Sequence, residues 1–294
     1  MVRKGRAGSS PAPGTASRMK TRIAPTPSGL LHAGNGAAFV LAWKLAREAG
    51  GTLLLRIDDL DAERVRPAYV KDVFATLHWL GIDWDEGPRD PEELVKFWSQ
   101  HLRMARYHSL LEQLRAGGHL YACACSRKAV RERAGALEYD GHCRDRQLSL
   151  DRPGLAWRLR LPVQERVAWR TWPLGAWREF GMDLPDPVVR QRNGRPAYHI
   201  ASLADDVQFG VDFIVRGADL LPSTAIQVYL ARLLGLDAFG RVCFLHHGLI
   251  RDANGIKRSK SQGADALQAS RAAGASPMEI HALADRLRTA AMGG

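Results

Sequence analysis

The chain has 294 residues, of which 46% are hydrophobic and 25% are charged, and its net charge is +11. This composition is typical of a globular protein, with room for about two domains, and it excludes disordered and fibrous classes. The basic balance favours a polyanionic partner such as nucleic acid, although six of the positive charges precede residue 23.

The first 20 residues form a basic leader that we expect to be flexible. Its longest uncharged stretch, 7–17, is rich in Gly, Ser, Pro and Ala and lacks the apolar core of a secretory signal. The body contains no run of the roughly 18 to 20 apolar residues that a membrane span requires. We therefore expect a cytoplasmic protein that does not enter a membrane.

Strand and helix patterns alternate along most of the chain, which predicts an α/β fold. In the first part of the chain, the predicted elements are a strand over 21–24, a turn over 25–29, a helix over 34–50, a strand over 52–57 and helices over 67–81 and 90–117. A strand over 155–161 and a hairpin over 188–200 around Asn193-Gly194 follow. The last predicted elements are a strand over 213–215, a helix over 223–235, a strand over 242–245 and a helix that begins with a capping box at 276–279. Three of the four cysteines and four of the eight tryptophans lie between residues 121 and 185. This change of character predicts an insertion.

Two segments carry candidate phosphate-binding residues. His32 and Asn35 stand three residues apart at the start of the first predicted helix, where backbone N–H groups and the helix N-terminus attract phosphate oxygens. Residues 257–261, Lys-Arg-Ser-Lys-Ser, place three cations within five residues. A helix cap and a solvated basic loop are the simpler interpretations of each segment alone. One follows the first strand of the α/β pattern and the other follows the last, so folding could bring them together.

These segments resemble the signatures of class I aminoacyl-tRNA synthetases. Residues 25–35, Pro-Thr-Pro-Ser-Gly-Leu-Leu-His-Ala-Gly-Asn, are similar to the H-I-G-H motif, and residues 257–261 are similar to the K-M-S-K-S loop. Residues 22–26, 56–61 and 215–221 resemble the glutamyl/glutaminyl branch of the family. The resemblance covers about residues 20 to 265, and it implies the Rossmann-like parallel sheet of that class.

The resemblance implies that a glutamate carboxylate attacks the α-phosphate of ATP and expels pyrophosphate, so catalysis rests on positioning and charge neutralisation. His32 and Asn35, with Gly34 between them, would bind the phosphates of ATP. Lys260, with Lys257 beside it, would hold the departing pyrophosphate. Mg²⁺ would arrive with ATP.

A glutamate substrate carries two carboxylates and one ammonium, so its pocket needs both cations and an anion. The resemblance implies that Arg22 and Arg216 supply the cations, Asp58 the anion and Tyr198 a hydroxyl. The complete expected set is Arg22, Ile23, Ala24, Pro25, Thr26, Asp58, Tyr198 and Arg216. Surface ion pairing is the simpler interpretation of any one of these arginines. The family usually has Glu where this chain has Asp58, which shortens the reach of the carboxylate by one methylene.

The expected insertion holds three clustered cysteines: Cys123, Cys125 and Cys143. With a fourth ligand they would make a closed tetrahedral zinc site, and the alternative is three buried thiols without metal. From chemistry alone the fourth ligand would be His142 or the distant Cys243. The pattern Cys-x-Cys followed by Tyr-x-x-x-Cys resembles the zinc site of glutamyl-queuosine tRNA(Asp) synthetases, which implies that Tyr139 is the fourth ligand of one structural zinc ion.

With the family as a guide, we divide the chain into five parts. They are a flexible basic leader (1–20), the first half of a Rossmann-like catalytic domain (21–120), a zinc-binding insertion (121–185), the second half of the catalytic domain with its K-M-S-K-S-like loop (186–262) and a short helical C-terminal tail (263–294). The 33 residues after Ser261 are too few for the anticodon-binding region of a full glutamyl-tRNA synthetase. We expect a monomer.

The short tail and the cysteine pattern match the glutamyl-queuosine subfamily. They imply glutamate activation without tRNA, followed by transfer of glutamate onto the queuosine base at the wobble position of tRNA(Asp). The anticodon stem-loop would bind where relatives bind an acceptor stem. Residues 123–170 hold 11 basic and 6 acidic residues interleaved with aromatic ones, which fits RNA binding, although the aromatic residues equally suit a small core.

Two other functions are compatible with parts of the sequence. One is a small-molecule nucleotidyltransferase that shares the H-I-G-H chemistry. The other is a non-catalytic, zinc-dependent RNA-binding protein, which leaves the expected glutamate-binding residues without a role.

Overall fold

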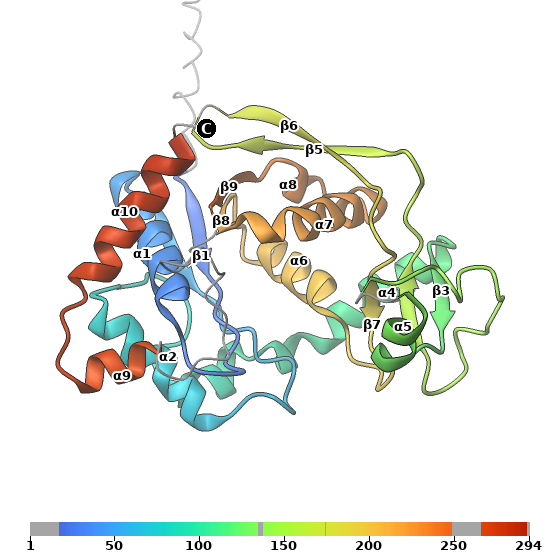
Figure 1. Ribbon diagram of the computed structural model, residues 1–294, viewed down its shortest axis with the longest axis horizontal. Helices are drawn as coiled ribbons and strands as arrows, with labels where there is room; N and C mark the ends of the chain where they lie inside the picture. Colours follow the sequence, from blue (N-terminus) through green and yellow to red (C-terminus); the bar gives the residue numbers. More distant parts are fainter. Residues whose placement is uncertain (1–17, 135–137, 174, 249–265, 293–294) are drawn as a thin grey trace, which may run out of the picture.

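The computed structural model describes residues 18–134, 138–173, 175–248 and 266–292. Strands from both halves of the chain lie side by side (Figure 1). They are β1 (Lys20–Ile23), β2 (Thr52–Leu55), β5 (Arg166–Thr171), β6 (Ala176–Gly181), β8 (Phe213–Gly217) and β9 (Cys243–His247). β2 pairs with β1, and β8 and β5 pair with either side of β9, all in parallel, whereas β6 pairs antiparallel with β5.

The two groups of parallel strands meet between β1 and β8. The N–H of Asp212 donates to the carbonyl of Lys20 at 3.0 Å, and the Asp212 carboxylate accepts the N–H of Lys20 at 2.7 Å. The expected parallel sheet is therefore present as two adjacent sheets, a parallel pair β1-β2 and a mixed sheet β6-β5-β9-β8 in which β6 adds an antiparallel edge. β5 and β6 fall within the range that we expected to be the insertion, yet β5 joins the sheet through β9.

Helices pack against these strands in two hydrophobic cores. The first core holds α1 (Ala33–Glu48), α2 (Pro67–Trp79) and α10 (Met278–Met292), and the short α9 (Leu267–Ala272) closes it. The second holds α4 (Met104–Ala116), α6 (Tyr198–Gln208), α7 (Leu221–Leu233) and α8 (Asp237–Gly240). A Cβ on Gly36 would lie 2.8 Å from Cδ1 of Leu267, so any larger residue there would require the Leu267 side chain to shift.

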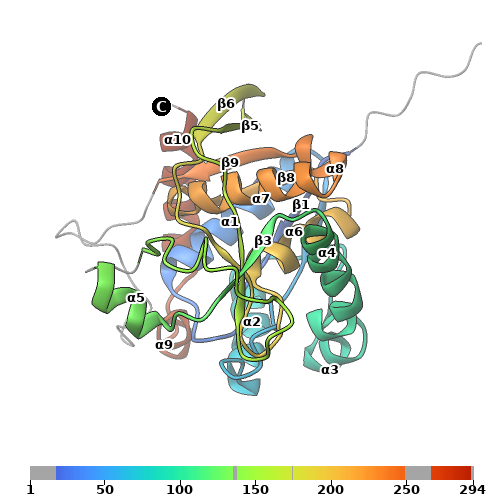
Figure 2. The same cartoon turned by 90° about the vertical axis from the view of Figure 1, so that its right-hand side faces the viewer.

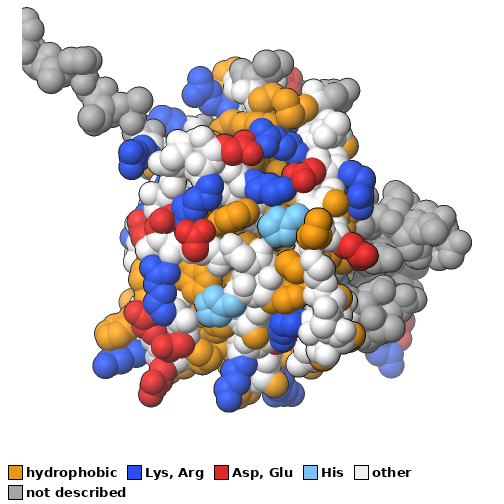
Figure 3. Space-filling model, turned by 90° about the vertical axis from the view of Figure 1, so that its left-hand side faces the viewer, with side chains coloured by type: hydrophobic (Ala, Val, Ile, Leu, Met, Phe, Trp, Pro, Cys, Tyr) orange, Lys and Arg blue, Asp and Glu red, His pale blue; other side chains and the backbone are white. Residues whose placement is uncertain are grey.

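The face seen from the left of Figure 1 carries basic and acidic side chains interspersed (Figure 3). Ion pairs join α1 to α10, namely Lys44 with Asp285 and Arg288 with Glu48, both at 2.6 Å. Opposite charges therefore alternate on this face, which does not present a single-sign surface to a polyanion. No described helix is long and apolar enough to cross a membrane.

The predicted helix over 90–117 is wrong as a single element. It forms α3 (Pro91–Glu93), a π-helical turn (Leu94–Trp98), a 3-10 turn (Gln100–Arg103) and α4. The break falls at Ser99, whose extended ψ of 139° leaves the helix. Both the Ser99 hydroxyl, at 2.6 Å, and the N–H of Gln100, at 2.8 Å, donate to Asp59. These bonds to a buried carboxylate replace helical ones, which single-sequence periodicity does not reveal.

The predicted hairpin over 188–200 is also wrong in its second strand. Its turn exists, with Gly194 at a φ of 85°, but the chain enters α6 at Tyr198. Buried apolar residues at Ile200, Leu203 and Ala204 follow helical spacing, and their packing overrides the turn signal. The first strand, β7 (Val188–Arg190), instead pairs with β4 (Ala156–Leu159), which also pairs with β3 (Leu120–Cys123). Figure 2 views the molecule from the side of this small sheet and of α5 (Arg127–Ala134).

Candidate active site and cysteine cluster

The candidate phosphate site lies at the N-terminus of α1. His32 is the N-cap, and its Nδ1 accepts the N–H groups of Gly34 (3.1 Å) and Asn35 (3.4 Å). The Asn35 side chain accepts the His32 N–H at 3.2 Å, which completes a capping box. Because Nδ1 accepts, the proton of the neutral ring lies on Nε2, which becomes a hydrogen-bond donor. The first turn of α1 holds no acidic residue, so the positive end of its dipole is not offset there.

The chain after the second candidate segment returns to this same point. The N–H of Leu267 donates to the carbonyl of Leu31 at 2.8 Å, and Ala266 forms a β-bridge with His32. Lys257 and Lys260 lie outside the described residues. Ala266, which forms this bridge, follows Lys260 by six positions in the sequence.

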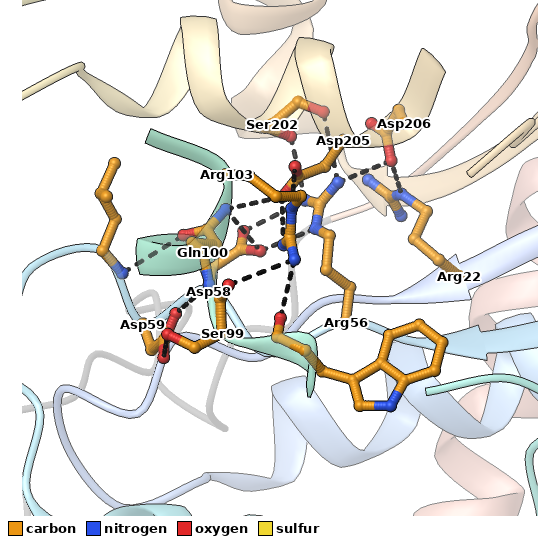
Figure 4. Close-up of polar contacts among 12 residues, drawn as sticks. Arg22, Arg56, Asp58, Asp59, Ser99, Gln100, Arg103, Ser202, Asp205 and Asp206 are labelled. Atoms are coloured by element: carbon orange, nitrogen blue, oxygen red, sulfur yellow. Dashed lines mark hydrogen bonds and ion pairs between the residues drawn. The ribbon is translucent and has the colours of Figure 1, made fainter. Parts of the chain in front are cut away.

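A buried charge network connects β1 and β2 to α6 (Figure 4). One carboxylate oxygen of Asp206, which is fully buried, accepts from Arg22 Nε at 3.1 Å and from Arg56 Nη1 at 2.7 Å. Burial lowers the pKa of Arg56, but the carboxylates of Asp206 and Asp58 raise it more, so the pKa lies well above its usual value. Asp206 of α6 therefore holds the Arg22 guanidinium in place and compensates its charge.

Asp58, the expected anion for a substrate ammonium, faces Arg56 in this structure. Arg56 donates to both oxygens of Asp58, at 2.7 and 3.1 Å. Burial raises the pKa of Asp58 despite this pairing. A carboxylate has about four acceptor positions, so the bidentate pair still leaves room for another donor. The role of Asp58 towards an ammonium group stays a prediction.

The second acid of α6 holds the broken helix in place. Asp205 accepts from Arg103 at 2.7 and 3.0 Å, from the Tyr107 hydroxyl at 2.7 Å and from the Gln100 amide at 2.9 Å. Burial raises the pKa of Asp205, but Arg103 and Arg56 outweigh it and lower the pKa overall. Gln100 also donates to Asp58 at 3.5 Å. The turn that follows Ser99 is thus fixed to Asp205 and Asp58.

Arg216, at the end of β8, is buried without an acidic partner within the described part of the chain. Its Nη1 donates to two neutral acceptors, Gln227 Oε1 at 2.8 Å and Thr224 Oγ1 at 3.2 Å. Its Nε and Nη2 and the amide nitrogen of Gln227 are buried with no hydrogen-bond partner. Burial lowers the pKa of Arg216, although arginine remains protonated. The chemistry of a buried cation with two unpaired donors is compatible with a carboxylate partner.

The other expected glutamate-binding residues surround these arginines. The backbone of residues 23–25 runs beside the end of β2, since Arg56 N–H donates to the Ile23 carbonyl at 3.0 Å and Asp58 N–H to the Pro25 carbonyl at 2.9 Å. Ile23 and Pro25 are buried, Ala24 is half-buried and Thr26 is exposed. Tyr198 begins α6, is 40% exposed and acts electrostatically on Arg216. Arg22 and Tyr198 therefore both act electrostatically on Arg216, whereas Asp58 is paired with Arg56.

The three cysteines of the insertion come together, as the sequence predicts. Their sulfurs lie within 4.8 Å of one another, and Cys125 Sγ is 3.5 Å from Cys143 Sγ. Thiolates around a tetrahedral zinc ion, with Zn–S bonds of about 2.3 Å, are about 3.8 Å apart. The Tyr139 hydroxyl lies 3.6 Å from Cys123 Sγ. The donor set therefore fits a closed zinc site with little movement.

The cysteine pKa values describe the cluster itself, and the positions of the other residues distinguish the candidates for the fourth ligand. Burial raises the pKa of Cys123, but the hydrogen bond from Arg158 lowers it overall, and burial raises the pKa of Cys125 to about 11. His142 is exposed and its Nε2 lies 3.2 Å from Arg146. Among the described residues, the metal-capable cluster contains neither His142 nor Cys243. Tyr139 is the candidate that reaches the sulfurs.

The sequence analysis missed Arg56, Asp205 and Asp206 as parts of the site. One signal was available, because two adjacent acids follow the apolar residues Ile200, Leu203 and Ala204 on a helix that must be buried. Buried acids are rare unless they are paired. The pairing partners are about 100 and 150 residues away, so the sequence does not identify them.

Comparisons with known proteins agree with this geometry. The family model "tRNA synthetases class I (E and Q), catalytic domain" matches residues 18–288. The glutamyl-Q tRNA(Asp) synthetase of Rhodobacter capsulatus is 37% identical over 289 residues, which cover 90% of this chain and 99% of that protein. The protein of the same name from Burkholderia cenocepacia is 38% identical over 257 residues, 84% of this chain and 82% of that one.

A solved structure supports the same assignment. The glutamate-tRNA synthetase of Elizabethkingia anophelis aligns with a TM-score of 0.69 at 25% identity, and the match covers 84% of this chain and 54% of that longer chain. The sequence identity extends over nearly the full length of relatives that share one name. The chain belongs to the glutamyl-Q tRNA(Asp) synthetase family, a family of ligases within the class I tRNA synthetases.

Proposed function

We propose that the protein activates L-glutamate with ATP, without requiring tRNA, and then transfers glutamate to the queuosine base at the wobble position of tRNA(Asp). In the first step a carboxylate oxygen of glutamate bonds to the α-phosphorus of ATP, and pyrophosphate leaves. In the second step a hydroxyl oxygen of queuosine attacks the carbonyl of the adenylate. The bond from that carbonyl to the phosphate oxygen breaks, AMP leaves and accepts the hydroxyl proton.

The buried, unpaired guanidinium of Arg216 is the observation that carries this proposal. Within the part of the chain that the structure describes, two of its nitrogens and the neighbouring Gln227 amide nitrogen lack acceptors, and Arg22 is paired with Asp206. One carboxylate would complete the hydrogen bonds of Arg216. An acidic amino acid therefore suits this pocket better than a neutral one, because a neutral side chain would leave the guanidinium charge uncompensated.

The N-terminus of α1 would bind the phosphates of ATP. His32 Nε2–H would donate to a phosphate oxygen, and Gly34 and Asn35 form the turn beside it. Lys260 and Lys257 would neutralise the leaving pyrophosphate, and Mg²⁺ would be bound mainly by ATP itself. The β-bridge of Ala266 to His32 supports this proposal, because Ala266 follows Lys260 by six positions in the sequence.

The cysteine cluster would hold one structural zinc ion through Cys123, Cys125, Cys143 and Tyr139. Zinc would crosslink β3 to the segment around Cys143, which lies 18 residues beyond Cys125. The acceptor would be the anticodon stem-loop of tRNA(Asp), and we expect the protein to act as a monomer in the cytoplasm.

Two assays test the proposal. Glutamate-dependent exchange of pyrophosphate into ATP, measured with no RNA present, tests the first step. Transfer of labelled glutamate to queuosine-containing tRNA(Asp), with queuosine-free tRNA(Asp) as control, tests the second. No exchange with glutamate would refute the activation step. Labelling of RNA-free acceptors instead of the tRNA would favour a small-molecule nucleotidyltransferase.

A further inference from the structure

A separate cavity of about 420 Å³ lies between the cysteine cluster and the candidate glutamate pocket. Its walls come from α5, β4, β7, α6 and α7, and they include Arg127, Val130, Arg158, Val188, His199 and Ile226. Cys125 and Tyr139, two of the expected zinc ligands, also line it. The cavity has the size of a small-molecule site.

One side of the cavity is apolar and the other is cationic. Val130, Pro187, Val188 and Ile226 supply the apolar side. The Arg158 guanidinium stacks 3.5 Å from the centre of the Tyr139 ring, and its Nε is buried without a hydrogen-bond partner. Planar guanidinium and phenol groups next to an apolar wall are typical of surfaces that stack an unpaired base.

The acid in this cavity is already neutralised. Both oxygens of Asp186 accept from Arg144 at 2.8 Å, and the Tyr121 hydroxyl and the Leu161 N–H donate to the same carboxylate, at 2.7 and 2.8 Å. Arg127, which is exposed, adds a positive charge at the cavity. The surroundings of the cavity therefore attract a phosphate backbone.

The cavity adjoins the candidate glutamate pocket through two pairs of consecutive residues. His199 lines the cavity, and its ring centre is 5.5 Å from that of Tyr198. Ile226 lines the cavity, and the next residue, Gln227, accepts from Arg216. His199 Nε2 lies 3.3 Å from Ser223 Oγ, which joins the starts of α6 and α7. A group in the cavity is thus one side chain away from the residues that would hold glutamate.

We propose that this cavity receives the acceptor nucleobase, a modified heteroaromatic base turned out of an RNA loop. The inference rests on the proposed function, because that reaction requires the base to lie next to the activated glutamate. Val188 and Ile226 would contact one face or edge of the base, and the Arg158 guanidinium would lie beside it. Arg127, which is exposed, would pair with a phosphate of the loop.

Filling the cavity tests the inference. The variant Val188→Trp places an indole in the cavity from a strand, where tryptophan is well tolerated. We expect pyrophosphate exchange with glutamate within twofold of the wild type, and kcat/KM for transfer to a queuosine-containing anticodon stem-loop at least tenfold lower. Val95→Trp, at a side chain that is already 70% exposed and far along the chain from the cavity, should change neither activity.

A second variant keeps the test decisive if Val188→Trp fails to fold. Arg127→Glu alters an exposed residue of α5, and we expect it to raise the KM for the stem-loop at least tenfold while exchange is retained. If the wild type transfers glutamate and both variants transfer it equally well, the cavity does not hold the base, and the proposed function still stands. If the wild type shows no transfer at all, the proposed function itself fails.

Discussion

Asp206 offers the sharpest test of the buried charge network. Its side chain is fully buried, and one of its oxygens serves both Arg22 and Arg56. Asp206→Asn keeps the shape but removes the charge that both guanidinium groups share. Breaking a buried ion pair costs about 3 to 5 kcal/mol, because the remaining cation is left without compensation. Arg56 keeps Asp58, so we expect the lower end, about 3 kcal/mol.

Urea unfolding followed by tryptophan fluorescence measures this change. With a slope of about 3 kcal/mol per molar urea, a loss of 3 kcal/mol lowers the midpoint by about 1 M. Glu179→Gln is the matched control, because it makes the same chemical change in the Arg166–Glu179 pair, whose side chains are 63% and 64% exposed. An exposed pair contributes about 0 to 1 kcal/mol, so the control should shift the midpoint by less than about 0.3 M.

The same variant has a consequence for the proposed substrate. With Asn at position 206, Arg22 keeps a neutral oxygen acceptor and its contact of 3.4 Å to the carbonyl of Val215, but it loses the charged partner, so its position relaxes. We expect the KM for glutamate in pyrophosphate exchange to rise about tenfold, equivalent to 1.4 kcal/mol. A midpoint shift no larger than that of the control, together with an unchanged KM, would refute the argument that Asp206 compensates and orients Arg22.

Four further expectations follow from individual groups. Arg216→Met should raise the KM for glutamate at least a hundredfold, which is about 2.7 kcal/mol. The thermal midpoint should not fall, because the variant removes a buried charge. An unchanged KM would exclude Arg216 as the carboxylate receptor. Burial and the nearby Arg216 lower the pKa of His199 to about 4, so below pH 6.5 the unfolded state binds a proton that the folded state does not. The unfolding free energy should therefore fall by about 3 kcal/mol from pH 6.5 to pH 4, and less steeply in His199→Gln; equal slopes would contradict this. Metal analysis should find one zinc per chain in the wild type and less in Cys125→Ser, whereas a metal-free wild type would remove the zinc site. Lys260→Ala should slow pyrophosphate exchange with a thermal midpoint within about 2 °C of the wild type, which calorimetry would check.

Local signals predicted much of the fold. The helices at 33–48, 67–79 and 221–233 and the strands at 20–23, 52–55 and 243–247 were expected within a few residues, because their apolar periodicity and end signals agree. The helix over 90–117 and the hairpin after Asn193-Gly194 were wrong for a common reason. In both segments long-range burial decides the backbone, through Asp59 at Ser99 and through the apolar face of α6.

For the candidate site, the sequence suggested two arginines but not the buried acids around them. Motif resemblance implied Arg22 and Arg216, and both are buried in one region. It did not imply Asp206, which lies 184 residues from Arg22 in the chain. Supporting ion pairs are fixed by the tertiary fold, so no local spacing reports them.

Arg22 has an acidic partner among the described residues and Arg216 has none. This difference explains how the proposed glutamate site can be stable and still attract a carboxylate. Arg22 is paired with Asp206, whereas Arg216 is held by the neutral oxygens of Thr224 and Gln227. Neutral acceptors fix the direction of a guanidinium without cancelling its charge. If both arginines had acids, an incoming carboxylate would gain little, and if neither had one, two uncompensated buried charges would destabilise the fold by several kcal/mol each. One paired and one unpaired arginine satisfies both requirements, and the carboxylate that we propose as ligand completes the charge balance at Arg216.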